Sequence, residues 1–215
     1  MKPASYNLFD MLFLRYPQLA GCRAQIFDAT DCLIRCYRSG GKLLICGNGG
    51  SASDAAHIVG ELMKSFILSR PVEESFRQKL LETDPQQGNR IAALLQGALP
   101  AIALTQESAL LSAFMNDVSP ELIYAQQVYG YGCAGDVLLC ISTSGNSKNI
   151  VAAAIVAKAK GLHTIALTGR ASSRLSEICD TSIQVPETDT NIVQELHLPV
   201  YHCLCVVLEQ EFFGT

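Results

Sequence analysis

The chain has 215 residues, a length that fits one domain with a sizeable buried core. It is 49% hydrophobic and only 17% charged, a composition that indicates a globular protein with little charged surface and favours an oligomer. The net charge of −4 and the scattered basic residues argue against nucleic-acid binding. Charged residues interrupt residues 1–37 every few positions, which excludes a signal peptide or membrane span there, so we expect no membrane contact.

The first part of the chain has the periodicity of amphipathic helices. Apolar residues recur at helical spacing over residues 6–38, with a break at Pro17, and Gly40 followed by Gly41 is a typical helix stop. We interpret residues 1–40 as an N-terminal helical segment whose apolar faces pack against a sister subunit.

Short apolar segments alternate with helical patterns through the rest of the chain. The segments with strand character are 43–46, 101–104, 137–141, 164–167 and 182–185. This alternation predicts a single α/β domain with a doubly wound, mainly parallel five-stranded sheet flanked by helices. In such sheets, ligands bind beyond the carboxyl ends of the strands.

Two segments depart from this alternation. Residues 67–99 are rich in charged and polar side chains, with breaks at Pro71 and Pro85, and we interpret them as a surface insertion containing one or two short helices. Residues 191–212 have the pattern of a long C-terminal helix, which we expect to be kinked or to start again near Pro199.

Nine cysteines are present, and most lie within apolar strand or helix patterns, where a reduced thiol behaves as a small hydrophobic side chain. The chain has no Cys-x-x-Cys spacing, which argues against a zinc knuckle. These observations favour reduced core thiols and a cytoplasmic protein.

Two loops of small polar residues follow predicted strands and lead into predicted helices. Residues 47–51 (Gly-Asn-Gly-Gly-Ser) supply glycines, which let the backbone approach a ligand closely, and the free amides of a first helical turn. Residues 142–147 (Ser-Thr-Ser-Gly-Asn-Ser) add hydroxyl groups that can donate to phosphate oxygens. Either loop alone is more often a tight connection. The same placement in both predicts two sides of one phosphate-binding site.

Titratable residues recur at helical spacing after the first loop and near the C-terminus. His57 and Glu61 stand four apart and share one helix face, and Gln194 and His202 stand eight apart, close to two turns. Taken singly, such residues are more often a surface pair or a structural histidine. Their weight comes from the loops beside them.

Further motifs connect these features: residues 116–117 (Asn-Asp), 135–139 (Gly-Asp-Val-Leu-Leu), 166–169 (Ala-Leu-Thr-Gly) and 194–197 (Gln-Glu-Leu-His). With the two loops, His57, Glu61 and His202, they resemble the sugar isomerase (SIS) domain family and, within it, the sedoheptulose 7-phosphate isomerases, or phosphoheptose isomerases. The resemblance covers most of the chain. The serine-rich loop alone indicates only the wider family.

The resemblance implies a homotetramer with active sites between subunits and a role for each matching residue. The implied substrate-binding residues are Asn48, Gly49, Gly50, Ser51, Glu61, Asn116, Asp117, Ser142, Thr143, Ser144, Ser147 and Gln194. The implied catalytic residues are Glu61 as base and His202 as acid, and the implied ligands of one zinc ion per site are His57, Glu61, Gln194 and His202. His197 has no matching role, and we expect it to be structural.

A glutamate and a histidine suit aldose–ketose isomerisation, because one group must take a proton from carbon while another protonates the oxygen, through an enediol. The resemblance further implies conversion of sedoheptulose 7-phosphate to D-glycero-D-manno-heptose 7-phosphate, the first step toward heptose-containing glycans. Two alternatives remain open. One is a non-catalytic SIS adaptor, related to a bacterial protein that assists the replication initiator and lacks the glutamate found here at Glu61. The other is an SIS isomerase or sensor for another phosphosugar.

Overall fold

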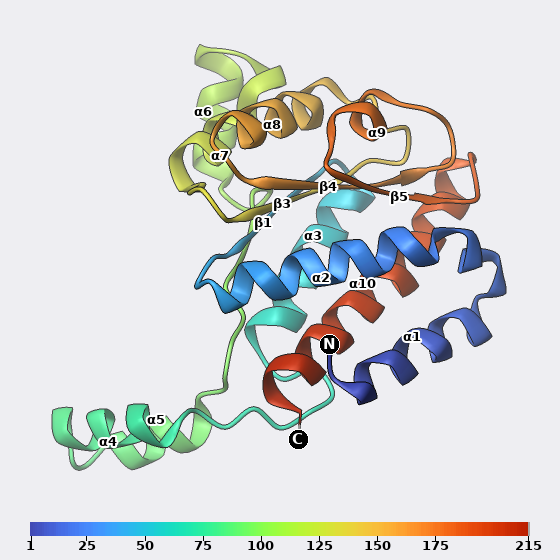
Figure 1. The fold of residues 1–215 in the computed structure, drawn as a ribbon. Coiled ribbons are helices and arrows are strands. Elements are labelled where there is room, and N and C mark those ends of the chain that lie inside the picture. The colour runs from blue at the N-terminus through green and yellow to red at the C-terminus, as the bar shows by residue number, and fades with distance from the viewer. Residues whose placement is uncertain (215) are drawn as a thin grey trace.

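The computed structural model describes residues 1–214 and contains a five-stranded parallel sheet between two layers of helices (Figure 1). The strands are paired in the order β2-β1-β3-β4-β5. Their bounds are β1 (Leu43–Gly47), β2 (Ala101–Ala103), β3 (Val137–Ile141), β4 (His163–Gly169) and β5 (Thr181–Val185). The predicted fold class and all five predicted strands are thereby confirmed.

Helices connect the strands and flank them on both sides. Before β1 come α1 (Pro3–Arg15), the 3₁₀ helix η1 (Pro17–Cys22) and α2 (Arg23–Arg38). Between β1 and β2 lie α3 (Gly50–Met63), α4 (Glu74–Thr83) and α5 (Gly88–Leu94). The remaining helices are α6 (Ser108–Asp117), η2 (Pro120–Leu122), α7 (Ile123–Tyr131), α8 (Lys148–Ala159), α9 (Arg174–Ile178) and α10 (Thr190–Phe213).

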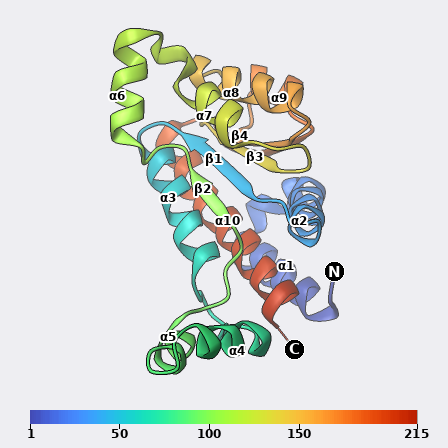
Figure 2. The same ribbon diagram turned by 90° about the vertical axis from the view of Figure 1, so that its left-hand side faces the viewer.

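Alternate side chains of each strand feed two separate cores, because successive residues point to opposite faces of a sheet. Leu43 and Ile45 of β1 pack with α2, α3 and α10, whereas Leu44 and Cys46 pack with α7 and α8. Figure 2 shows β1 between these two layers. Both faces are covered, which explains why the central strands are continuous apolar runs rather than alternating patterns.

The N-terminal helices break where the sequence predicts. Pro17 begins η1, because its ring fixes φ and it has no amide proton to continue α1. α1 packs along α10, and the two chain ends meet: the Lys2 ammonium donates to the Gln210 carbonyl at 3.2 Å, and the Ser5 hydroxyl donates to Glu211 at 2.6 Å. α1 thus packs against α10, whereas α2 also contacts β3 and β5 of the sheet (Figure 1). Apolar side chains of both helices are buried in the chain's own core.

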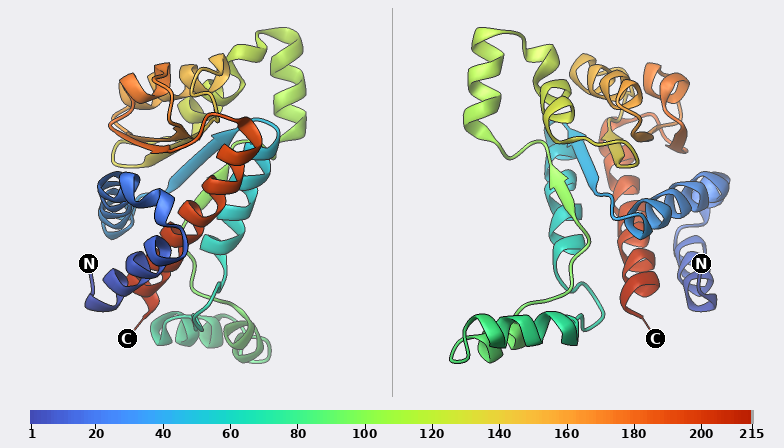
Figure 3. Two further views of the ribbon diagram at one scale, coloured as in Figure 1. Left: turned by 90° about the vertical axis from the view of Figure 1, so that its right-hand side faces the viewer. Right: turned by 60° about the vertical axis from the view of Figure 1, so that its left-hand side comes forward.

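The helices α4 and α5 form a hairpin that stands away from the rest of the molecule (Figure 3). No residue of α4 is buried, and Phe76 and Leu94 are exposed. An antiparallel bridge between Pro71 and Gln96 closes the base of the hairpin. The predicted insertion at residues 67–99 contains this hairpin and the two chain segments that connect it to α3 and to β2.

α10 is one continuous helix through Pro199, so the expectation of a fresh start at this proline is wrong. Pro199 is buried, and so are Leu196, His197 and Val200 around it. The alternative expectation of a kink at Pro199 stays a prediction. By length and composition α10 also meets the criteria for a membrane span, and 61% of its most apolar window is buried inside the fold. This burial is typical of the core helix of a globular domain.

A buried ion pair joins α10 to the end of α3. The Arg70 guanidinium contacts Glu209 at 2.7 Å, and both side chains are 0% exposed. Arg70 also donates to the carbonyls of Glu61 and Leu62 at 3.0 and 2.9 Å, and so caps the last turn of α3. Burial alone raises the pKa of Glu209, but hydrogen bonds from the Phe66 and Ile67 amides and from Arg70 outweigh it and lower that pKa.

Removing only one partner of this pair should destabilise the fold strongly. We expect Arg70→Met to cost about 3–5 kcal/mol in the free energy of unfolding, because it leaves a buried carboxylate uncompensated. Arg70→Met with Glu209→Gln should recover part of this loss, since the neutral amide removes the buried charge and its oxygen still accepts one of the two backbone hydrogen bonds. Chemical denaturation measures both.

The matched control is Arg77→Met, which removes an exposed ion pair to Glu74 on α4. It should change the free energy of unfolding by less than about 0.5 kcal/mol. Equal losses for Arg70→Met and Arg77→Met would contradict a structural role for the buried pair.

Candidate active site

A polar cavity of about 280 Å³ lies beyond the carboxyl ends of β1 and β3. The chain leaves β1 through α3 toward β2 at one edge, and leaves β3 through α8 toward β4 on the other side. This is the topological switch point of the sheet, where such folds bind ligands. The cavity is lined by Asn48, Gly49, Gly50, Ser51, Ile141, Ser142, Thr143, Ser147, Ile150, Thr190 and Gln194. The two predicted loops therefore meet at one cavity.

The first loop depends on glycine at two positions. Gly49 has φ +54°, a backbone conformation that residues other than glycine rarely adopt. A Cβ atom on Gly50 would lie 2.7 Å from Nε2 of Gln194, so the missing side chain lets α10 approach the start of α3. The loop thereby places Gln194 of the last helix at the cavity.

The second loop is held in shape by its own hydroxyl groups. The Ser142 hydroxyl accepts from the Gly145 amide at 3.2 Å and lies 3.4 Å from the Ser147 hydroxyl. Gly145 has φ +66° and lets the chain turn tightly. Ser142, Thr143 and Ser147 line the cavity, whereas Ser144 is exposed and accepts from the Asn146 amide outside it.

Three helix N-termini converge on this cavity. Gly50 and Ser51 begin α3, Ser147 precedes α8, and Thr190 begins α10. Within residues 1–214, none of the three N-cap residues makes a side-chain hydrogen bond to its helix, and no lysine or arginine lines the cavity. First turns without side-chain caps and the positive ends of three helix dipoles together favour an anion such as phosphate.

An amide pair connects the two loops across the mouth of the cavity. Asn48 and Asn149 exchange two hydrogen bonds of 2.9 Å, and the Tyr124 hydroxyl lies 3.2 Å from the Asn48 amide oxygen. Sequence reasoning missed Tyr124 and Asn149. An amide side chain two residues beyond the serine-rich loop is the only signal that could have indicated Asn149.

A line of polar residues runs from the cavity along the contact between α3 and α10. We call it the α3–α10 seam, and it consists of Gly50, Asp54, His57 and Glu61 on α3 with Gln194, Tyr201 and His202 on α10. The α3 members recur at intervals of three and four residues, so they share one helix face. The seam therefore connects the predicted phosphate site to the predicted acid and base.

Glu61 lies at the far end of the seam. Its two carboxylate oxygens face His57 Nε2 at 3.3 Å and Lys64 Nζ at 3.2 Å. The Glu61 side chain is 12% exposed, so it is largely shielded yet open at one side. The predicted sharing of one face by His57 and Glu61 is confirmed by this contact.

His57 has a second contact through its other ring nitrogen. Nδ1 lies 3.1 Å from the Tyr201 hydroxyl, which donates to Asp54 at 3.2 Å. Burial raises the pKa of Asp54, while the hydrogen bond from Tyr201 and the charge of His57 oppose that shift. Sequence reasoning missed Asp54 and Tyr201, although Asp54 lies three residues before His57 and thus on the same helix face.

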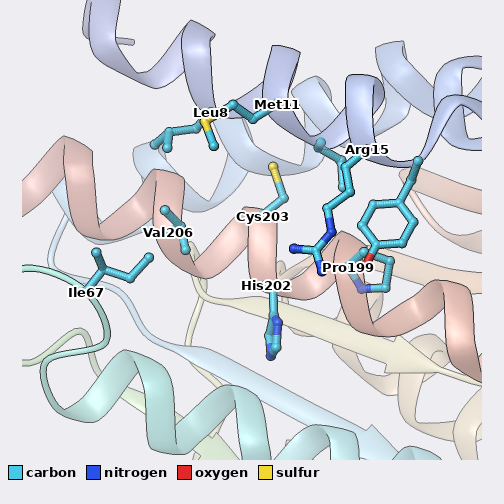
Figure 4. Close-up of a pocket in the computed structure, with 10 residues that line it drawn as sticks. Leu8, Met11, Arg15, Ile67, Pro199, His202, Cys203 and Val206 are labelled. Atoms are coloured by element: carbon cyan, nitrogen blue, oxygen red, sulfur yellow. The ribbon is translucent and has the colours of Figure 1, made fainter.

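The His202 ring points from α10 toward α3, away from an apolar groove between α1 and α10 (Figure 4). It packs edge-on against the His57 ring at 5.0 Å, and its buried Nε2 has no hydrogen-bond partner within residues 1–214. Burial chiefly, and then the nearby His57, lower the pKa of His202, opposed by Glu61. The two predicted catalytic groups thus lie in one cluster around His57.

The four predicted zinc ligands do not form a zinc site within one chain. Gln194 lines the cavity, and His57, Glu61 and His202 cluster further along the seam. Within residues 1–214, no three His, Cys, Asp or Glu side chains are placed to hold a metal ion. The zinc set therefore stays a prediction, for elemental analysis of the purified protein to test, and we derive no step through zinc.

Two further predicted residues lie outside the cavity. Asn116 and Asp117 are exposed at the end of α6 and hydrogen bond to each other at 2.8 Å. No residue of α6 is buried. His197, expected to be structural, is fully buried on α10, and burial lowers its pKa to about 4.

Comparison with known sequences identifies the family. An SIS domain model matches residues 81–169. The phosphoheptose isomerase of Chromohalobacter salexigens is 37% identical over 190 residues, which cover 87% of this chain and 83% of that protein. The phosphoheptose isomerase of Maridesulfovibrio salexigens is 36% identical over 210 residues, 98% of this chain and 87% of that protein. The chain belongs to the phosphoheptose isomerase family.

Solved structures of phosphoheptose isomerases share the fold. The Francisella tularensis protein superposes with a TM-score of 0.75 at 31% identity, covering 91% of each chain. The Neisseria gonorrhoeae protein superposes with a TM-score of 0.70 at 28% identity, covering 94% of this chain and 98% of that chain. The phosphoheptose isomerase fold therefore extends over nearly the whole chain.

Gly50→Ala should weaken anion binding. Its Cβ atom would push Gln194 out of the cavity, and we expect about tenfold weaker binding of inorganic phosphate, or about 1.4 kcal/mol, measured by titration calorimetry. Gly60→Ala on the same helix is the control, because its Cβ meets nothing within 4 Å. It should leave phosphate binding unchanged and stabilise α3 by about 0.5–1 kcal/mol. Equal phosphate affinity in both variants would contradict the placement of the anion site.

Proposed function

We propose that the protein is an aldose–ketose isomerase that converts sedoheptulose 7-phosphate to D-glycero-D-manno-heptose 7-phosphate. The observation that carries this proposal is the α3–α10 seam, with the polar cavity at one end and a carboxylate beside histidines at the other. Glu61 stands eleven residues beyond Gly50, which is roughly 16 Å of helix.

In this proposal the phosphate binds at the helix N-termini and the reacting carbons lie beside Glu61. Glu61 takes a proton from C1 of the ketose while an acid protonates the oxygen at C2, which gives an enediol. Removal of the proton from the C1 oxygen and delivery of a proton to C2 then give the aldose. The Lys64 ammonium lies 3.2 Å from the second carboxylate oxygen of Glu61.

His202 is the proposed acid. Its Nε2 atom is buried and has no hydrogen-bond partner within residues 1–214, so no side chain or main-chain group there competes for it. General acid and base groups in such positions each contribute roughly 10² to 10⁴ in rate. Serine hydroxyls and main-chain amides hold the phosphate meanwhile, and so keep the reacting carbons in place.

Family membership and the retained Glu61 favour the isomerase over a non-catalytic adaptor with the same fold. The choice among phosphosugars depends on the far end of the seam, because the cavity recognises phosphate rather than sugar length. An SIS isomerase acting on another phosphosugar is therefore the second candidate, and the substrate test below distinguishes the two.

We further propose that the enzyme works in the cytoplasm, in heptose biosynthesis, as a homotetramer with active sites between subunits. The exposed position of Asn116 and Asp117 supports the assembly, since they can contact substrate only at another subunit's site. Exposed apolar side chains such as Leu14 and Val118, at 85% and 63%, also favour burial against other copies.

Glu61→Gln should abolish most turnover, because the amide keeps the shape of the side chain but cannot accept the carbon-bound proton. We expect kcat to fall at least about a hundredfold. NMR measures this kcat by following the formation of aldose 7-phosphate from sedoheptulose 7-phosphate. The control is Glu195→Gln, at an exposed position. Near-normal turnover of Glu61→Gln would exclude this base, and no turnover of the unmodified protein would favour another phosphosugar.

The assembly has its own test. Light scattering of the purified protein should give four times the chain mass of 23.2 kDa. Asn116→Ala should retain this mass and lose activity, because it removes a proposed contact to the substrate and no contact that stabilises the fold. A monomer with full activity would contradict the proposed shared site.

A further inference from the structure

The hydroxyl group of Tyr124 reaches the first cavity loop from α7. The Tyr124 ring is buried in the core that β1 and β3 share with α7 and α8, and the residue is 5% exposed. Its hydroxyl proton is shared between two acceptors, the Gly47 carbonyl at 2.7 Å and Oδ1 of Asn48 at 3.2 Å. Burial chiefly, and then the neighbouring Cys46, raise the pKa of Tyr124 to about 12, so the phenol keeps this proton at neutral pH.

Both acceptors lie where β1 ends and the first loop begins. Gly47 is the last residue of β1, and Asn48 is the first loop residue that lines the cavity. A Cβ atom on Gly47 would lie 2.4 Å from the Ser51 carbonyl oxygen, so the chain folds closely back on itself here. The Ser51 amide donates to the Asn48 carbonyl at 3.0 Å. The Tyr124 hydroxyl therefore holds the main chain and a side chain of the loop at one place.

The Asn48 side chain connects this contact to the second loop. Its Nδ2 donates to Oδ1 of Asn149, and its Oδ1 accepts from Nδ2 of Asn149, both at 2.9 Å. An amide oxygen has two lone pairs, so Oδ1 of Asn48 can accept from Tyr124 and from Asn149 together. Asn149 lies in the first turn of α8, two residues beyond Ser147 of the cavity lining. Hydrogen bonds thus run from α7 through the first loop to α8, and each pairs one donor with one acceptor.

The anion site depends on the separation of its two loops, because their amides and hydroxyls must reach one phosphate together. Asn48 is exposed and Asn149 is half-buried, so water competes for the hydrogen bonds of the amide pair. The hydrogen bond from Tyr124 to the Gly47 carbonyl is buried and adds an anchor that water does not weaken. A loop already held in its binding arrangement loses less conformational entropy when a ligand binds.

We propose that Tyr124 is a positioning residue for the phosphate end of the substrate, which acts through Asn48 and Asn149 to fix the separation of the two cavity loops. In this role it touches neither the phosphate nor the reacting carbons. The proposal rests on the anion site of the proposed function, but not on the chemistry at Glu61. Binding of inorganic phosphate therefore tests it without any turnover.

The first experiment removes the hydroxyl and leaves the ring in place. Tyr124→Phe should weaken binding of inorganic phosphate about three- to tenfold, as expected for the loss of one hydrogen-bonding group, measured by titration calorimetry. The matched control is Tyr37→Phe, because Tyr37 is also buried but its hydroxyl has no hydrogen-bond partner within residues 1–214. This control should bind phosphate as the unmodified protein does. Equal phosphate affinity in Tyr124→Phe and Tyr37→Phe would overturn the proposal.

A second substitution separates positioning from a merely structural role. Asn149→Ala removes the far end of the connection and should also weaken phosphate binding. If Tyr124 acts through the amide pair, Tyr124→Phe should change phosphate affinity by less than about twofold in the Asn149→Ala background, because the two losses are not additive. A full further loss in that background would contradict the proposed connection. So would a lower free energy of unfolding in Tyr124→Phe with unchanged phosphate affinity.

Kinetics with sedoheptulose 7-phosphate supply an independent measurement. We expect Tyr124→Phe to raise KM about three- to tenfold and to change kcat by less than about twofold, because the hydroxyl acts on the phosphate end alone. A lower kcat with unchanged KM would overturn the positioning role. No turnover by the unmodified protein, with phosphate affinity lowered by Tyr124→Phe, would support the proposal and count against the isomerase function. No phosphate binding by the unmodified protein would overturn both the anion site and this proposal.

Discussion

The buried ion pair between Arg70 and Glu209 holds together three parts of the chain that no shared secondary structure connects. Glu209 belongs to α10, the carbonyls capped by Arg70 belong to α3, and Arg70 itself lies at the base of the α4–α5 hairpin. Leu62 accepts hydrogen bonds both from Arg70 and from the Leu99 amide, where the chain returns toward β2. Buried hydrogen bonds and an ion pair thus fix the end of α3 that carries Glu61. The α4–α5 hairpin beyond it stands away from the core, and no residue of α4 is buried.

Because the end of α3 is anchored, this helix rigidly connects the polar cavity at its first turn to the cluster around Glu61 at its last turns. Its first turn contributes backbone amides to the proposed anion site, and its second to fourth turns contribute Asp54, His57 and Glu61. α10 runs beside it and supplies Gln194 near the first end and Tyr201 near the second. Two helices packed along one seam can hold groups at fixed separations more accurately than loops can.

The sequence was sufficient for the sheet and for both cavity loops because these features are local. A strand covered on both faces is a short apolar run, and Gly49 and Gly145 signal turns without reference to the rest of the chain. The pair His57 and Glu61 was predictable because helical spacing determines which side chains share a face. The continuity of α10 through Pro199 was not predictable from the sequence, since packing of the helix overrides the tendency of proline to interrupt a helix.

The unpredicted residues act across long sequence separations. Tyr201 meets Asp54 and His57 only after α10 docks on α3, and Arg70 meets Glu209 in the same way. No local pattern distinguishes such residues from ordinary core positions. For Asn116 and Asp117 the one-chain structure has the same limit as the sequence, because their predicted contacts lie beyond a single chain.

The proposed anion site relies chiefly on helix ends and main-chain amides rather than on charged side chains. Peptide groups are common to every residue, so substitutions around the cavity can accumulate while the charge of the site persists. The proposed reacting end has no such redundancy, because proton transfer there is assigned to two particular side chains, Glu61 and His202. Sequence drift in this protein should therefore change what is done to a bound phosphate ester sooner than it abolishes the binding, which is a favourable starting point for new sugar chemistry or for regulatory binding without catalysis.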